Sequence, residues 1–158
     1  MGRGLDVRLR LAGGDRAPEN HGSSIVEAHL DTLVTIHSLV RWLVLVALVA
    51  GIVVAFGASR RPGEAFADPI FSGVAIVVDI QVTIGIILWI FNDGWSQSVF
   101  MAYIHPIAML AALGVAHAAI GRGRKAAKRD HAGGNRIVAI GLVVALVLVI
   151  GAVPWERL

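Results

Sequence analysis

The stretch TIHSLVRWLVLVALVAG, residues 35–51, is an almost continuous apolar run that carries one histidine and one arginine. Such a run supplies most of a membrane-spanning helix, which needs about 20 predominantly apolar residues. His37 and Arg41 are four residues apart and therefore lie on one face of that helix. Because ionisable groups are costly in hydrocarbon, we expect this face to point into a protein interior.

Three further stretches share this apolar character, and the 158-residue chain is 56% hydrophobic and only 16% charged. That composition is too apolar for a soluble domain of this size and is typical of a small membrane protein. Four long apolar runs with short connections predict an all-α fold, a four-transmembrane-helix up-and-down bundle with antiparallel neighbours. The expected spans are residues 33–57, 70–91, 99–120 and 137–154.

The N-terminal residues 1–30 are expected to form a disordered tail ahead of a four-helix domain at 31–158. Residues 1–22 contain glycine, proline and mixed charge, and they lack the apolar core of a signal peptide. A misassigned start codon would account for this segment equally well, so no function is attached to it.

Positive charge is distributed unevenly among the three connections. Residues 58–69 and 121–136 contain most of the lysines and arginines, whereas the connection at 92–98 contains none. The positive-inside rule then predicts a bacterial cytoplasmic membrane protein with both basic loops in the cytoplasm and both termini outside. Aromatic residues that prefer a membrane interface fall near the predicted outer side: Trp89, Trp95, Tyr103 and Trp155.

Composition excludes several chemistries. The chain contains no cysteine, so disulfides, iron–sulfur clusters and thiolate metal sites are ruled out. Its net charge is +3, but no DNA- or RNA-binding motif is visible, so we expect a lipid bilayer and not nucleic acid as its surroundings. No nucleophile–base pair, phosphate loop or metal triad is visible either, so an independent enzyme is not expected, but an electron-transfer subunit of an enzyme remains open.

Few polar side chains interrupt the predicted spans: His37, Arg41, Asp79, Gln81, His105 and His117. His37 and His105 belong to the first and third spans, each about 6–9 Å below the same predicted interface at about 1.5 Å per residue. These two helices are diagonal partners in an up-and-down bundle, and their separation suits two imidazoles with a porphyrin iron between them. His37 and His105 are therefore the predicted axial ligands of one haem b.

Structural roles for the histidines, without a bound cofactor, also remain open. An intramembrane histidine is often a hydrogen-bonding residue between helices, and His117, near the predicted cytoplasmic end, is interpreted in this way. A zinc or copper site at His37 and His105 lacks a convincing third ligand.

The other polar residues also allow two interpretations. Arg41 either faces a haem propionate or pairs with Asp79, since a paired charge is cheaper to bury than a lone one. Without such a partner, Asp79 would be a proton-carrying carboxylate. Gln81 lies roughly 200° around the helix from Asp79 and must face a different neighbour.

Local features predict how the helices are shaped and packed. Pro106 follows His105 and cannot donate a backbone hydrogen bond to Ala102, and a kink that frees this carbonyl would turn His105 toward the bundle axis. Small residues at spacings of four in the third and fourth spans predict close helix contact. They are Ala108, Ala112, Ala116, Gly141 and Ala145.

A series of motifs resembles a group of small four-helix bacterial integral membrane proteins labelled cytochrome b-like. The motifs are HSLVRW in the first span, DIQVTIGIIL in the second, HPIAMLAALGVAH followed by GRGRKA in the third, and the final VPW. The resemblance covers residues 30–156 and draws attention to His37, Arg41, Trp42, Asp79, Gln81, His105, Pro106, Pro154 and Trp155. Diheme four-helix cytochromes use four histidines, but the inner side of this chain offers only His117, so one bis-histidine haem is the most we expect.

These observations predict an integral membrane b-type cytochrome-like protein with one haem near the outer face, which transfers single electrons. A membrane quinol and an outer, periplasmic acceptor are the expected redox partners, and an oligomer or a larger complex remains open. The alternatives are a haem-free accessory subunit of a larger membrane complex and a proton or small-solute permeation path at Asp79.

Overall fold

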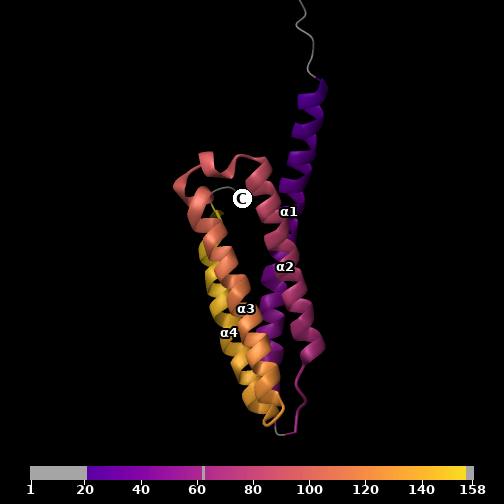
Figure 1. Cartoon of the computed structure of the whole chain (residues 1–158). Helices are drawn as coiled ribbons and strands as arrows, with labels where there is room; N and C mark the ends of the chain where they lie inside the picture. Colours follow the sequence, from indigo (N-terminus) through magenta and orange to yellow (C-terminus); the bar gives the residue numbers. More distant parts are fainter. Residues whose placement is uncertain (1–20, 62, 156–158) are drawn as a thin grey trace, which may run out of the picture.

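The computed structural model describes residues 21–61 and 63–155, and within these ranges every regular element is helical (Figure 1). The predicted all-α four-helix bundle is confirmed. The elements are α1 (His21–Ser59), α2 (Asp68–Phe91), the short 3₁₀ turn η1 (Gly94–Ser96), the π-helical turn η2 (Phe100–Ile104), α3 (His105–Ala127) and α4 (His131–Ala152).

The four long helices form a ring in which each packs on two others. α1 contacts α2 and α4, and α3 also contacts α2 and α4, so α1 and α3 lie diagonally across the bundle as expected. The α3–α4 contact is the most extensive, and the α2–α3 contact is the least extensive of the four. The seam between α2 and α3 is therefore the loosest side of the bundle.

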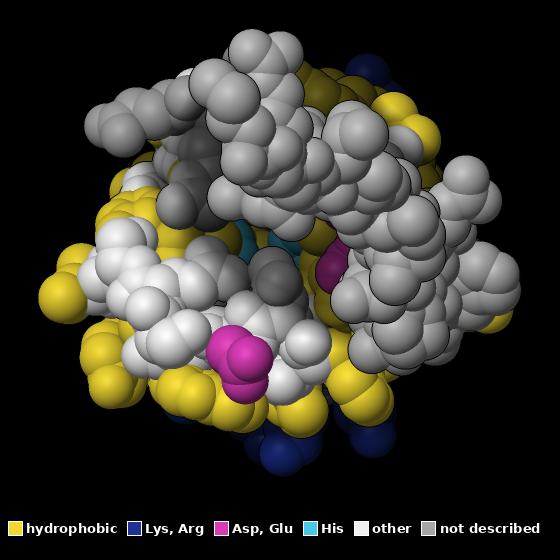
Figure 2. Space-filling view, turned by 90° about the horizontal axis from the view of Figure 1, so that it is seen from above, with side chains coloured by type: hydrophobic (Ala, Val, Ile, Leu, Met, Phe, Trp, Pro, Cys, Tyr) yellow, Lys and Arg dark blue, Asp and Glu magenta, His cyan; other side chains and the backbone are white. Residues whose placement is uncertain are grey.

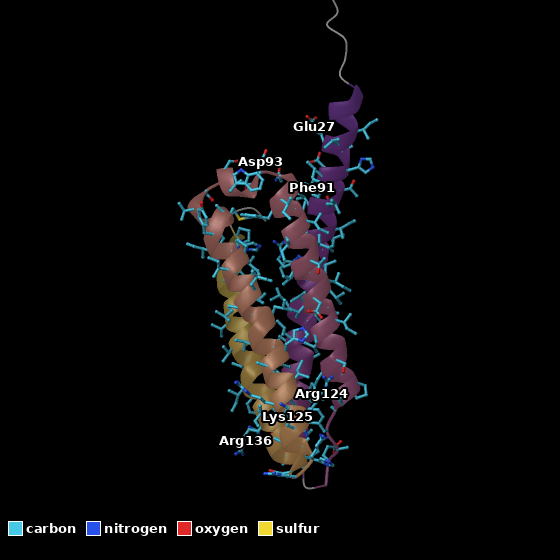
Figure 3. The ribbon with its side chains drawn as sticks, in the orientation of Figure 1. Glu27, Phe91, Asp93, Arg124, Lys125 and Arg136 are labelled. Atoms are coloured by element: carbon cyan, nitrogen blue, oxygen red, sulfur yellow. The ribbon has the colours of Figure 1, made fainter. Side chains whose placement is uncertain are left out.

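The two ends of the bundle differ in charge. Residues 92–99 with η1 lie at one end, beside the last residues of α4, and we call this the upper end (Figure 1). Figure 3 shows Glu27 and Asp93 toward this end, whereas Arg124, Lys125 and Arg136 lie toward the opposite end, which we call the basic end. The charge asymmetry expected from the sequence is therefore retained in space.

Two of the predicted boundaries differ from the structure. Residues 21–30, expected in the tail, are helical and extend α1, because this segment contains no proline and includes glutamate, alanine and leucine, which favour a helix. Residues 1–20 lie outside the described residues. The predicted loop at 121–136 is reduced to residues 128–130, because α3 and α4 extend into it and Asp130 caps α4 through the backbone N–H groups of Ala132 and Gly133.

Small residues bring α3 and α4 together, as the sequence predicts. A Cβ atom added at Gly134 would lie 2.7 Å from the carbonyl oxygen of Gly123, and one added at Gly141 would overlap the Cβ atom of Ala119. Gly123 and Gly134 were expected in a loop, but they are packing residues within helices. Their lack of a side chain allows the two backbones to approach closely.

Most large apolar side chains that the bundle does not bury point outward. Val46, Val53 and Val147 are each about two-thirds exposed, as expected for side chains that contact lipid. All four long helices are long and apolar enough to cross a membrane. The described helices therefore indicate a multi-pass membrane protein.

The α3–α4 contact generates a direct test of the packing. Gly141→Ala should lower the free energy of unfolding by about 1–3 kcal/mol, because the added methyl group overlaps Ala119 and overpacks the interface. Gly57→Ala is the matched control, since nothing lies within 4 Å of its added Cβ atom and alanine favours the helix. Denaturant unfolding in mild detergent distinguishes the two; equal stability of both variants would contradict this packing.

Candidate functional site

A cavity of about 290 Å³ lies between the helices toward the upper end. Residues from all four long helices and from the 92–99 connection line it, and its walls are mainly apolar, with Val44, Met109 and Val149 among them. Figure 2 views the molecule from this end and shows histidine side chains inside a central hollow. The cavity volume is at the lower limit of small-molecule sites, roughly 300 Å³. A cavity of this size has room for a compact ligand, or for part of a larger ligand whose edge remains outside.

Two of the predicted site residues, His37 of α1 and His105 of α3, meet in this cavity. Their ring centroids are 6.3 Å apart and the ring planes are inclined at 72°. The prediction that these imidazoles lie at one level across the bundle is therefore consistent with the described geometry. Phe100 also lies near His105, with ring centroids 6.5 Å apart.

The orientation of His105 is fixed by the end of α4. His105 Nδ1 lies 2.7 Å from the carbonyl oxygen of Ala152, and because a carbonyl only accepts hydrogen bonds, Nδ1 carries the proton. Ala152 is the last residue of α4, where carbonyl groups have no partner within the helix. This contact leaves the Nε2 lone pair of His105 free to bind a ligand or a metal.

His37 is held against α2. The amide nitrogen of Gln81 donates to the backbone carbonyl of His37 at 3.1 Å and lies 3.3 Å from its Nε2 atom. Gly85 leaves room for the ring, since an added Cβ atom would lie 3.0 Å from His37 Cε1. Within the described residues, His37 Nδ1 and Gln81 Oε1 are buried without a hydrogen-bond partner. A ligand or an ordered water in the cavity would supply the hydrogen bonds that these two atoms lack.

Pro106 shapes the helix that carries His105. The π-helical turn η2 precedes α3 directly, and the carbonyl of Ala102, four residues before Pro106, accepts a hydrogen bond from Trp89 Nε1 at 3.1 Å. Trp89 packs over Gly94, where any added Cβ atom would overlap the indole ring. The Ala102 carbonyl, to which Pro106 cannot donate, therefore accepts a hydrogen bond from an α2 side chain.

Arg41 lines the cavity, and its guanidinium lies 5.6 Å from the ring centroid of Trp42. Trp42 itself is half exposed on the outer surface of the bundle. Among the described residues that line the cavity, Arg41 is the only lysine, arginine, aspartate or glutamate. The cavity therefore favours a ligand with a negative group near Arg41.

The proposed pairing of Arg41 with Asp79 is not what the structure shows. Asp79 Oδ1 instead lies 2.8 Å from Nε2 of His117, across the seam between α2 and α3. Arg41 is on α1, whereas Asp79 points toward α3, so the two charges face different neighbours. Gln81 lies on the opposite side of α2 from Asp79 and faces His37, as its position around the helix predicts.

The separation of the two imidazoles has the size that a bis-imidazole haem requires, and the Gln81 amide beside His37 Nε2 would have to turn away for that atom to bind the iron. Two imidazoles on opposite sides of one metal ion, with metal–nitrogen bonds of about 2 Å, have ring centres roughly 6 Å apart, and each ring is free to rotate about its bond. The His37–His105 separation is of this size. No group of three or more His, Cys, Asp or Glu side chains able to hold a metal ion occurs among the described residues. A macrocycle that brings its own four nitrogens needs only two protein ligands.

Sequence reasoning missed three contributors to the site, Gly85, Trp89 and the Ala152 carbonyl, and also missed the burial of Asn135 away from the site. Gly85 and Trp89 were not associated with the histidines, because glycine in an apolar helix commonly serves helix packing and tryptophan near an interface commonly anchors the helix in the membrane. The Ala152 contact uses a backbone carbonyl, so no side chain in the sequence indicates it. Asn135, assigned to a loop, is fully buried in α4, and its Nδ2 donates to the carbonyl of Ala65 at 3.4 Å.

Comparisons with known proteins give no relative for this chain. No family model, no curated protein and no solved structure matches it.

The Trp89–Ala102 hydrogen bond generates a test of the site's support. Trp89→Phe should lower the free energy of unfolding by about 1–3 kcal/mol, because the Ala102 carbonyl freed by Pro106 loses its donor. Trp95→Phe removes a neighbouring indole that is half exposed and should cost about 0.5 kcal/mol or less. Unfolding in mild detergent measures both; an equal loss for both variants would contradict a specific role for Trp89.

Proposed function

We propose that this protein is a small integral membrane b-type cytochrome that holds one haem between His37 and His105 and passes single electrons. The observation that carries the proposal is the meeting of these two imidazoles, from diagonal helices, inside a mostly apolar cavity. The hydrogen bond that fixes the proton of His105 on Nδ1 supports it further, because metal-binding histidines usually donate their other N–H to a carbonyl or carboxylate.

The chain's own residues would have distinct roles around the haem. His105 presents Nε2 while Ala152 orients its ring, and His37 is positioned by Gln81 and by the space above Gly85. Arg41 supplies a positive charge for a propionate group, and the apolar walls keep water away and so tune the reduction potential. The haem, when bound, supplies the one-electron redox chemistry.

The proposed orientation follows from charge. With the basic end in the cytoplasm of a bacterium, the upper end faces outward, and a haem held there would pass electrons from a membrane quinol to an outer acceptor. The aromatic residues near the upper end suit this arrangement, because Trp95 and Tyr103 are both about half exposed, as expected at a membrane interface.

The decisive measurement is an optical spectrum of the purified protein after expression with sufficient haem. We expect a Soret band that shifts on reduction, together with stoichiometric haem. His37→Ala and His105→Ala should each lose most of it, and imidazole added to His105→Gly should restore part of it by filling the vacated ligand position.

His117→Ala and His131→Ala are the matched controls, because neither residue lines the cavity, and both variants should retain haem. Absence of any haem band in the native protein would exclude the proposal and favour the haem-free accessory subunit. Full haem retention in both His37→Ala and His105→Ala would exclude this ligand pair.

A further inference from the structure

The Asp79–His117 pair lies in an unusual place for charged groups. Both side chains are about half exposed, 45% for Asp79 and 50% for His117, although they belong to the middle of two membrane-spanning helices. Neither residue lines the cavity, so the proposed haem does not account for them.

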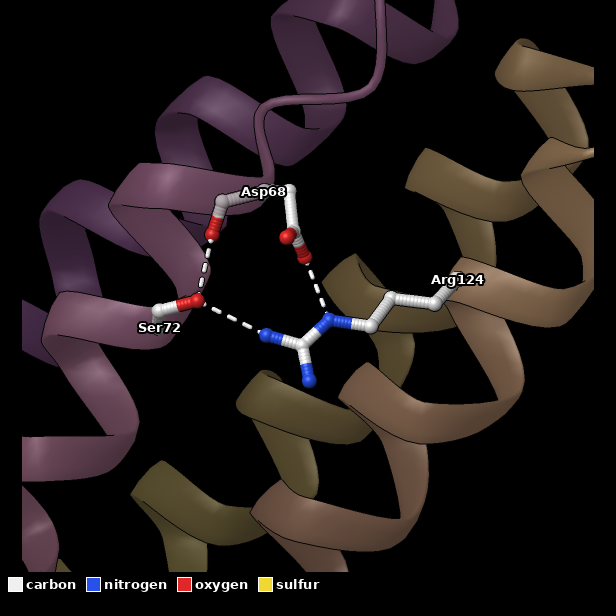
Figure 4. A network of polar contacts seen from close by, with 3 residues as sticks. All are labelled: Asp68, Ser72 and Arg124. Atoms are coloured by element: carbon white, nitrogen blue, oxygen red, sulfur yellow. Dashed lines mark hydrogen bonds and ion pairs between the residues drawn. The ribbon is translucent and has the colours of Figure 1, made fainter.

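The depth of the pair follows from the contacts between α2 and α3. Trp89 meets Ala102 near the upper end, and Arg124 binds Asp68 and Ser72 near the basic end (Figure 4). Asp79 is ten residues from Trp89 and eleven from Asp68, which is about 15 Å in either direction. The pair therefore lies near the centre of a hydrocarbon layer roughly 30 Å thick.

Lipid cannot solvate this pair. Ionisable side chains within a bilayer normally face protein or a water-filled cavity, because each exposed polar atom in hydrocarbon costs free energy. Asp79 Oδ2 and His117 Nδ1 have no hydrogen bond within the described part of the chain. A further protein surface that supplies a donor and an acceptor at this depth would satisfy both atoms.

The surface around the pair is shaped for close approach by another helix. Ile76 and Thr83 flank Asp79 on α2, and Gly114 and Gly121 flank His117 on α3, one turn before and after it. Cβ atoms added at Gly114 and Gly121 would meet nothing within 4 Å, so both glycines leave space for a second helix to approach the backbone of α3. We call these six residues the seam surface: Ile76, Asp79, Thr83, Gly114, His117 and Gly121.

We propose that the seam surface is the contact between two copies of this chain, related by a two-fold axis parallel to the helices. Such an axis brings together residues at equal depth, and the 2.8 Å contact shows that Asp79 and His117 are at equal depth. Each copy therefore offers an acceptor where the other offers a donor. In such a pair His117 keeps the contact of Nε2 with its own Asp79, and one proton held between its Nδ1 atom and Asp79 Oδ2 of the second copy closes a ring of four side chains.

Single cysteines test the contact, because the native chain contains none. In liposomes that contain only the purified protein, oxidation of Gly114→Cys or Gly121→Cys should give a disulfide-linked dimer. Val46→Cys and Val147→Cys are matched controls, since both side chains are about 65% exposed on other helices, and they should remain monomeric. No dimer from either glycine variant, or equal dimer from the controls, would overturn the proposal.

Exchanged charges test the role of the pair itself. Asp79→His and His117→Asp should each weaken self-association at least roughly tenfold, the effect of one or two intramembrane hydrogen bonds, measured by energy transfer between labelled copies. A mixture of the two variants should associate as a heterodimer, because each site then pairs with its opposite. Native-like association of both single variants would contradict the proposal; haem content, measured alongside, should not change, which separates this contact from the cytochrome function.

Discussion

The arrangement of this protein depends on one constraint: a polar group among membrane-spanning helices must find its partner within protein. The histidine site obeys it through short contacts to backbone. His105 donates to the Ala152 carbonyl, Gln81 donates to the His37 carbonyl, and Trp89 donates to the Ala102 carbonyl. Each of these acceptors lies on another helix or turn, so the same bonds that satisfy the polar groups also fix how the helices meet around the cavity.

The sides of the bundle are held together by different kinds of contact. Glycine and alanine draw α3 and α4 into close contact, with Gly134 set directly against Gly123, and the hydrogen bond from His105 to the Ala152 carbonyl joins the two helices at the upper end. The α2–α3 side is loosest, and there the helices are linked by separate polar contacts, one near each end and one in the middle. The bundle thus has one closely packed side, one cavity and one polar seam.

The His37–His105 pair and the His117–Asp79 pair have different surroundings, and this difference separates their proposed roles. His37 and His105 face a cavity with a single arginine and mostly apolar walls, which suits a flat redox cofactor with acidic groups at its edge. His117 and Asp79 face outward at mid-depth, which suits a protein neighbour instead. A haem site at one end and a dimer contact at the centre of the seam do not compete for residues, so both proposals can hold for the same molecule.

The sequence by itself determined the four apolar spans, the diagonal relation of the first and third helices, and the similar depth of His37 and His105, because hydrophobic length and helical periodicity are local properties. It also identified Ala102 as a freed carbonyl, since the effect of proline on the preceding turn is local. Only the tertiary structure decided that Asp79 pairs with His117 and not with Arg41, that Trp89 donates a hydrogen bond to the Ala102 carbonyl, and that residues 121–136 are mostly helical. Those outcomes depend on how each helix is rotated about its axis and on contacts between distant segments. A small rotation of a helix changes which of several neighbours at similar depth a side chain meets.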